Sequence, residues 1–260
     1  MNKHISTLTL DHAGLGIPPG RYALPGEPAA RLHAQAAGLD PDQFAEHLRE
    51  HYTGRRPVAD LTPVEFTFLR DELQEQVDDR RQQALDYFGT HVPRRFAHAE
   101  PDAPARDWAA RVVAAPHDTQ SLLLVGPVGV GKTHYGYSVL RAVAETGSAI
   151  KWQAYTAANL YAALRPRDDR RADSDYESIA HSPLLFVDDL GAAKLTEWAE
   201  EVTYRLINDR YERCLPSIFT TNVLPGQLGA TVGDRVASRI AEMCERTALK
   251  GTDRRKKVSK

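Results

Sequence analysis

A glycine-rich segment near the middle of the chain has the residue types and the spacing of a phosphate-binding loop. It fits the pattern Gly-x-x-x-x-Gly-Lys-[Ser/Thr] and comprises Gly126, Pro127, Val128, Gly129, Val130, Gly131, Lys132 and Thr133. The glycines let backbone N–H groups converge on a phosphate, and a helix that begins there adds positive potential. We therefore expect Lys132 to reach the β- and γ-phosphates of a nucleotide and Thr133 to ligate Mg²⁺.

A second segment ends in two acids, which is typical of the metal-binding strand of such a site. Residues 184–187 read Leu-Leu-Phe-Val and lead directly into Asp188 and Asp189. We expect Asp188 to hold the Mg²⁺ shell, directly or through water. We expect Asp189 to act as the general base on the attacking water. Many strands end in acids at turns, but this pair follows the glycine-rich loop by about sixty residues, and the two segments together indicate a nucleotide site.

Two further segments carry polar side chains that could act on the same nucleotide. The strand-like residues 217–220 lead to Asn222, which is the candidate probe of the γ-phosphate or the water; turn capping is the alternative. Arg235 and Arg239 are four residues apart, so on a helix they share a face. Such an arginine could stabilise charge on the phosphoryl group held by a neighbouring subunit. A solvated helix face is the alternative.

The elements that must position these residues alternate between strand and helix patterns. Strand-like runs occur at 121–125, 150–154, 184–187 and 217–220, with helical patterns between them. This alternation predicts an α/β fold with a parallel sheet that helices cover on both faces. Residues 89–106 carry three prolines and read as a connector. We expect a region over 1–90 that is partly irregular and partly helical, and a second domain over 91–260.

These segments, in this order, resemble the AAA+ ATPases of the DnaC/IstB group, the bacterial replicative helicase loaders and transposase helper ATPases. The resemblance covers about residues 90–256. It rests on VPRRF at 92–96, LLLVGPVGVGKTH at 122–134, LLFVDDLG at 184–191, EWAEEVTYRLINDRYERCLPSIFTTN at 197–222, VGDRVASRI at 232–240 and KGTDRR at 250–255. The resemblance implies a P-loop AAA+ domain over 91–260 that uses ATP and Mg²⁺, with a partner-binding region before it.

The same resemblance assigns roles to single residues. It adds His134 to the nucleotide-binding segment. It matches Asn222 to the sensor 1 position, Arg239 to the arginine finger and Arg235 to its companion. Arg254 matches the sensor 2 position, where an arginine reaches the phosphates of its own subunit. The arginine finger implies a homo-oligomer that forms through Arg239 contacts.

Two functions remain open within this group. The first, which we expect for this chain, is loading of a replicative helicase onto single-stranded DNA during replication. The second is the IstB-type role, in which an ATPase remodels duplex DNA and activates a transposase. A small-molecule P-loop kinase is disfavoured because Arg235, Arg239 and Arg254 fit an oligomeric ATPase better than a lid. A scaffold that binds nucleotide without hydrolysis is disfavoured by the intact set of one lysine and two acids.

Composition excludes several other classes. The 260 residues include 33 Lys and Arg and 35 Asp and Glu, a formal net charge of −2, so any contact with DNA needs a local patch. The stretch 245–260 is one candidate, with seven basic and two acidic residues. Two cysteines, Cys214 and Cys244, cannot form a metal cluster or a disulfide framework. No apolar run approaches the ~18 residues of a membrane span, and no secretory signal begins the chain, so we expect a cytoplasmic protein.

Overall fold

The structure is a computed structural model, and it describes residues 23, 25–52, 55, 57–165, 171–192 and 196–253. Contacts between residues divide the chain into two compact units, Met1–Gln83 and Ala84–Lys260. The division falls inside one long helix, α3 (Pro63–His91). Each unit has an apolar cluster of its own, so each is described by itself.

The described residues of the first unit form helices around a small apolar cluster. Its described elements are α1 (Glu27–Ala36), α2 (Pro41–Tyr52), the 3-10 helix η1 (Val58–Asp60) and the first part of α3. At the start of α3, Thr62 Oγ1 accepts a hydrogen bond from the Glu65 N–H (3.3 Å) and Glu65 Oε2 accepts one from the Thr62 N–H (2.8 Å). This reciprocal pair satisfies two donors that a helix start leaves open. The described part of the N-terminal region is mainly helical.

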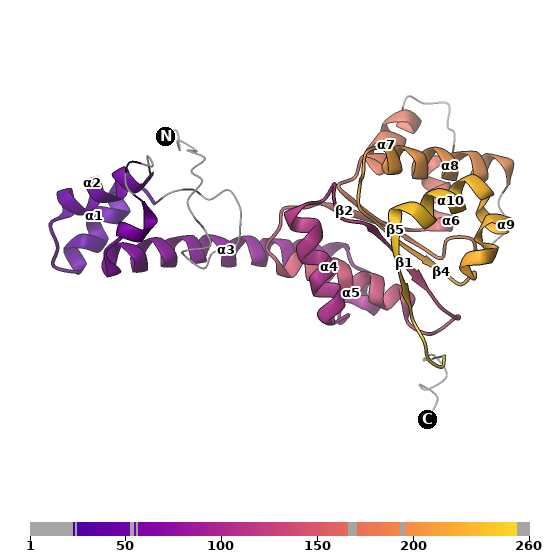
Figure 1. Ribbon diagram of the computed structural model, residues 1–260, viewed down its shortest axis with the longest axis horizontal. Coiled ribbons are helices and arrows are strands. Elements are labelled where there is room, and N and C mark those ends of the chain that lie inside the picture. Colours follow the sequence, from indigo (N-terminus) through magenta and orange to yellow (C-terminus); the bar gives the residue numbers. More distant parts are fainter. Residues whose placement is uncertain are drawn as a thin grey trace. The chain divides into compact units, whose positions relative to one another are not determined.

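The second unit contains a five-stranded parallel sheet (Figure 1). Its strands are β1 (Ser121–Val125), β2 (Trp152–Thr156), β3 (Leu184–Asp188), β4 (Ser217–Thr221) and β5 (Cys244–Ala248), in the spatial order β2-β3-β4-β1-β5. All neighbouring pairs are parallel, so the carboxyl ends of the strands lie at one edge. The sequence analysis missed β5, because this edge strand has the largely polar sequence Cys-Glu-Arg-Thr-Ala and lacks an apolar run.

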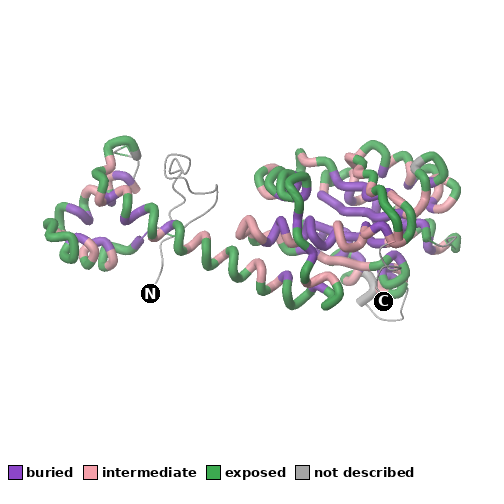
Figure 2. The backbone as a smooth tube through the Cα atoms, turned by 90° about the horizontal axis from the view of Figure 1, so that it is seen from below, coloured by how far each residue is buried: buried purple, intermediate pink, exposed green. Residues whose placement is uncertain are grey.

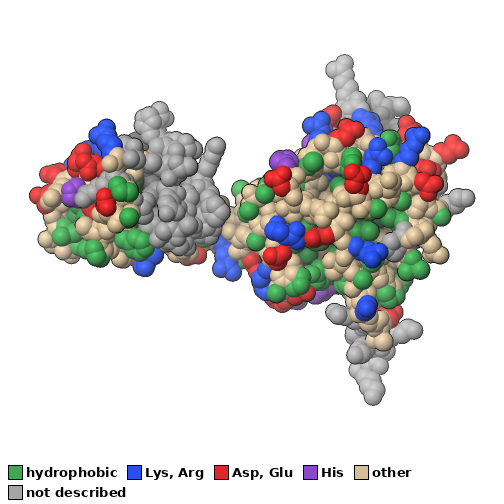
Figure 3. Space-filling view, in the orientation of Figure 1, with side chains coloured by type: hydrophobic (Ala, Val, Ile, Leu, Met, Phe, Trp, Pro, Cys, Tyr) green, Lys and Arg blue, Asp and Glu red, His purple; other side chains and the backbone are tan. Residues whose placement is uncertain are grey.

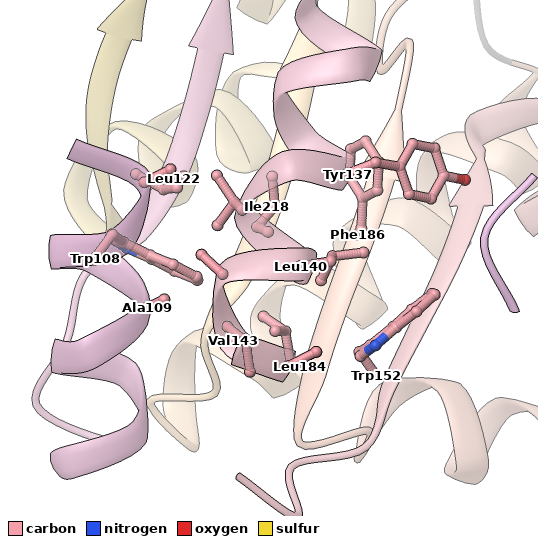
Figure 4. Close-up of a cluster of buried hydrophobic side chains, with 14 of the residues drawn as sticks. Trp108, Ala109, Leu122, Tyr137, Leu140, Val143, Trp152, Leu184, Phe186 and Ile218 are labelled. Atoms are coloured by element: carbon pink, nitrogen blue, oxygen red, sulfur yellow. The ribbon is translucent and has the colours of Figure 1, made fainter. Parts of the chain in front are cut away.

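Successive strand residues point to opposite faces of the sheet, and here both faces carry apolar side chains. Helices therefore cover both faces. On one face, Leu122 and Phe186 pack with Trp108 in a cluster that includes α4 (Ala103–Ala114) and α5 (Lys132–Glu145), as Figure 4 shows. On the other face, Leu123 and Val187 pack with α6 (Ala157–Leu164), α7 (Arg171–Ala180), α8 (Glu197–Glu212), α9 (Leu228–Val232) and α10 (Asp234–Met243). The expected α/β fold is confirmed.

The exposure of the chain follows this layering. Figure 2 shows buried residues along the strands and exposed residues on the outer sides of the helices. β1, β3 and β4 are buried along their whole length. Among the described helices, none is both long enough and apolar enough to cross a bilayer.

A buried arginine fixes the amino ends of β3 and β4. The Arg210 side chain on α8 is fully buried and donates hydrogen bonds to the carbonyls of Ala180 (2.9 Å), Ser182 (2.9 Å) and Pro216 (2.7 Å) and to Ser217 Oγ (2.8 Å). Burial lowers the pKa of Arg210 to about 9, so the guanidinium is still charged at neutral pH. These bonds hold the two central strands in register, and their opposite ends carry the candidate site.

The end of α3 belongs to the second unit. Phe88 and Val92 are buried in the same cluster as Trp152, and Tyr87 Oη donates a hydrogen bond to the Trp152 carbonyl (3.1 Å). The connector prolines suggested a boundary between residues 90 and 91, whereas the contacts divide the chain between Gln83 and Ala84. A helix that runs through a boundary gives no composition change at the point where its packing partners change.

Candidate functional site

The glycine-rich loop lies where β1 ends and α5 begins. β1 ends at Val125 and α5 begins at Lys132, so the loop leads directly into the helix N-terminus. Gly129 (φ 80°) and Gly131 (φ 106°) adopt backbone conformations that side chains other than glycine rarely tolerate. This geometry gives the loop the form of an anion-binding turn at a helix start.

Lys132 joins the loop to the end of β4. Its side chain is buried, and Nζ donates hydrogen bonds to the carbonyls of Gly126 (2.8 Å) and Pro127 (2.9 Å). A third bond goes to Oδ1 of Asn222, which follows β4 directly. The structure thus brings together two residues that the sequence analysis chose from segments far apart.

Thr133 lies against the first acid after the β3 apolar run. Its Oγ1 is 3.0 Å from both carboxylate oxygens of Asp188, which is buried. Burial is the main cause that raises the pKa of Asp188, and the nearby Asp189 carboxylate adds to it. Hydrogen bonds from Thr220 and Thr133 and the charge of Lys132 act in the opposite direction without cancelling the rise. A cation at these oxygens would stabilise the charged carboxylate.

Asp189 turns away from the strand in a left-handed conformation, with φ of 58°. Its carboxylate accepts a hydrogen bond from Asn222 Nδ2 (3.3 Å). It also lines a cavity of about 400 Å³ together with Tyr161 and Trp198, so a small molecule can reach this part of the site. Asn222 therefore lies between the lysine of the loop and the second acid.

A buried hydroxyl that the sequence analysis did not select connects the two acids. Thr220 Oγ1 donates to Asp188 Oδ1 (2.6 Å) and accepts the backbone N–H of Asp189 (2.8 Å). The residue is fully buried in β4. The sequence shows that β4 ends in hydroxyls, but only the register of β3 against β4 reveals which hydroxyl faces the acids.

The predicted arginine finger lies elsewhere in the second unit. Arg239 Nε donates to Asn208 Oδ1 (2.7 Å), and a guanidinium nitrogen lies 3.3 Å from Tyr204 Oη. The guanidinium is 4.9 Å from the centre of the Tyr204 ring, and that of Arg235 is 5.8 Å from it. Within the part of the chain that the structure describes, both arginines face α8 rather than the glycine-rich loop. That either arginine acts on a nucleotide held by a neighbouring subunit stays a prediction.

The remaining selected residues differ in their surroundings. His134 is half-buried in the first turn of α5, Val130 is buried, and Val128 is exposed. Arg254, the expected sensor 2 residue, lies outside the described residues.

The segment after β5, which leads to Arg254, lies against the glycine-rich loop. The Leu249 N–H donates to the Val125 carbonyl (2.8 Å). A Cβ added to Gly126 would be 2.4 Å from the Leu249 carbonyl oxygen, and one added to Gly129 would be 2.0 Å from Asp253 Oδ1. These loop glycines therefore also make room for the C-terminal segment.

A parallel α/β sheet with a lysine-bearing loop and two acids at its carboxyl edge defines a P-loop nucleotide-binding protein of the AAA+ fold. The chain belongs to the family of IstB-like ATP binding proteins, whose model matches residues 98–260. It is 31% identical over 184 residues to an ATP-binding protein of an insertion sequence from Mycobacterium tuberculosis, a match that covers 70% of this chain and 66% of that one.

Relatives named for replication are also similar to the chain. It is 29% identical over 112 residues to the replicative helicase loader DnaI of Bacillus subtilis, covering 42% of this chain and 35% of that one. Among solved structures, the DnaC helicase loader is 26% identical with a TM-score of 0.50, covering 61% of this chain and 100% of that one. The chain spans less than two thirds of the length of the curated relatives it matches.

The carboxylate of Asp253 predicts a measurable effect on nucleotide affinity. Because it lies beside Gly129, its negative charge opposes a polyphosphate on the loop. Asp253→Asn should tighten binding of a fluorescent ATP analogue by about threefold to tenfold, as expected when one partly exposed charge is removed. Asp118→Asn, an exposed acid just before β1 at the opposite end of that strand, removes the same charge and should leave the affinity unchanged. Equal affinities for Asp253→Asn and the wild type would contradict this electrostatic role.

Proposed function

We propose that the chain binds ATP with Mg²⁺ at the glycine-rich loop and hydrolyses it. The observation that carries the proposal is the pair of contacts that links Lys132 through Asn222 to Asp189, beside Thr133 and Asp188. A lysine and a carboxylate are both buried there, and charged side chains are seldom buried without a partner or a function. Together these residues offer a cation that can bind phosphates (Lys132), oxygen ligands for a metal ion (Thr133 and Asp188) and a base that can accept a proton from water (Asp189).

The oxygen donors fit Mg²⁺, which prefers hard oxygen ligands. Thr133 Oγ1 and the Asp188 carboxylate already lie within 3.0 Å of each other, and the raised pKa of Asp188 shows a buried carboxylate that a cation would stabilise. When bound, Mg²⁺ neutralises charge between the β- and γ-phosphates. Thr133 and Asp188 are the residues that hold it in this proposal.

Each remaining residue has a separate task. Lys132 turns its ammonium from the carbonyls of the loop to the phosphates. Asp189 accepts a proton from the attacking water, and Asn222 orients that carboxylate through its amide. Arg239 stabilises the transferring phosphoryl group of a neighbouring subunit, with its guanidinium oriented by Asn208 and Tyr204.

We further propose that ATP use serves a DNA transaction, with help to a transposase as the first candidate. The family model and the 184-residue match to an insertion-sequence protein favour it. Helicase loading is the second candidate, which the similarity to DnaI and to the DnaC structure favours. Basic and acidic side chains intersperse on the face of the second unit in Figure 3, so DNA contact needs a local patch and should weaken steeply with salt.

The two DNA roles predict different responses of ATP turnover. A transposase helper that remodels duplex DNA should be stimulated more by duplex than by single-stranded DNA of equal length. A helicase loader should show the reverse preference. Turnover is measured with both DNAs at two salt concentrations, and stimulation by neither would contradict a DNA-dependent ATPase.

Two substitutions test the site itself. Lys132→Ala should lose both nucleotide binding and turnover, because it removes the charge that neutralises the β- and γ-phosphates.

Asp189→Asn should bind the nucleotide like the wild type but turn it over at least about a hundredfold more slowly, because an amide cannot accept the proton. Binding is measured with a fluorescent ATP analogue and turnover by phosphate release. Wild-type turnover in Lys132→Ala would exclude the loop as the site.

A mixing experiment tests the role of Arg239. Arg239→Ala should keep ATP affinity, since its own loop is intact, but lose turnover by about 10³-fold if it acts as a finger in trans. Mixing it with Lys132→Ala should restore part of the activity, because an intact loop can then face an intact Arg239. Absence of rescue at all mixing ratios, with assembly verified by light scattering, would leave Arg239 with a structural role, the contact of α10 with α8.

A further inference from the structure

Thr220 stands out among the buried polar groups because its one hydroxyl bonds to both acids. It donates to the Asp188 carboxylate (2.6 Å) and accepts the backbone N–H of Asp189 (2.8 Å). Its own carbonyl accepts the Leu190 N–H (2.8 Å), so three consecutive residues after the β3 apolar run are tied to one residue of β4. A hydroxyl has one donor and two acceptor sites, and here the donor and an acceptor serve different acids.

The two bonds have different consequences. The bond to the Asp188 carboxylate fixes the rotation of a side chain that also contacts Thr133, so it determines where these oxygens point. The bond from the Asp189 N–H satisfies a half-buried donor at a left-handed residue, whose backbone conformation sets the direction of its carboxylate. Loss of the hydroxyl would release both at once.

We propose that Thr220 is a positioning residue that sets the metal-binding carboxylate and the basic carboxylate in one step. The inference rests on the proposed ATP site. Thr220 does not touch the nucleotide in this proposal; it acts through Asp188 and Asp189. We therefore expect the Thr220 hydroxyl to affect the gain in nucleotide affinity that Mg²⁺ produces. We do not expect it to affect the contact of the loop with the nucleotide.

The neighbouring residue supplies a matched control. Thr221 is also fully buried in β4, but its hydroxyl donates to the Leu190 carbonyl (2.7 Å) and accepts the Val223 N–H (3.1 Å). Thr221→Val removes a buried hydroxyl of the same strand with the same change in shape. Thr220→Ser keeps the hydroxyl and removes only a methyl group.

The test uses the full chain and a fluorescent ATP analogue, titrated with and without Mg²⁺, together with steady-state turnover. Thr220→Val should bind the analogue without Mg²⁺ within about twofold of the wild type. It should lose Mg²⁺-dependent tightening, raise KM by the factor that this tightening contributes in the wild type, and reduce kcat by about 10- to 100-fold, as loss of an outer contact to a metal ligand does. Thr220→Ser should return to within about threefold of the wild type, and Thr221→Val should keep the Mg²⁺ dependence.

The outcomes separate this inference from the proposed function. A wild type that binds no nucleotide would overturn the ATP site and the inference with it. A wild type with Mg²⁺-dependent binding, alongside a Thr220→Val variant that behaves like Thr221→Val, would overturn the inference alone. Failure of Thr220→Ser to recover would likewise reject the hydroxyl as the active group. Folding of the variants is judged by circular dichroism, and a folded Thr220→Val that loses binding without Mg²⁺ would also overturn the inference. If Thr220→Val does not fold, Thr220→Ala carries the same comparison.

Discussion

The order β3-β4-β1 across a parallel sheet is the constraint on which the site depends. Because these three strands are neighbours and run the same way, the residues that follow them meet at one edge. The loop after β1 then reaches Asn222 after β4, and Asn222 reaches Asp189 after β3. A different strand order would leave the same residues in the sequence but separate them in space.

Burial of charge gives the sheet edge its chemistry and also makes it costly to fold. Lys132 and Asp188 are taken from water. In place of that water, Lys132 donates hydrogen bonds to the loop carbonyls and to Asn222, and Asp188 accepts them from Thr133 and Thr220. Arg210 repeats the principle at the opposite ends of β3 and β4, where one guanidinium satisfies four acceptors. The central strands are thus held by polar contacts at both ends and by apolar packing between them.

The sequence predicts those parts of the site whose chemistry is local. The glycine-rich loop, the apolar run before Asp188 and the strand before Asn222 each carry their signal within a few residues, and the structure assembles them. Thr220 and β5 were missed because the role of Thr220 depends on the register of β3 against β4 and because β5 is an edge strand of largely polar sequence. Composition marks the proline-rich connector after α3, whereas Phe88 is already buried in the cluster of the second unit, because a helix that continues past a change of packing partners shows no break in composition. The sequence also left the role of Arg239 dependent on a second subunit.

The most direct measurement is a crystal structure of the full chain with Mg²⁺ and a non-hydrolysable ATP analogue. We expect the triphosphate on residues 126–133, with the Lys132 ammonium moved from the Gly126 and Pro127 carbonyls to phosphate oxygens. We also expect an ion about 2.1 Å from an oxygen of Thr133, with Asp188 bound directly or through one of its waters. An analogue bound elsewhere, with the contact between Thr133 and Asp188 unchanged and no ion beside it, would contradict the central claim.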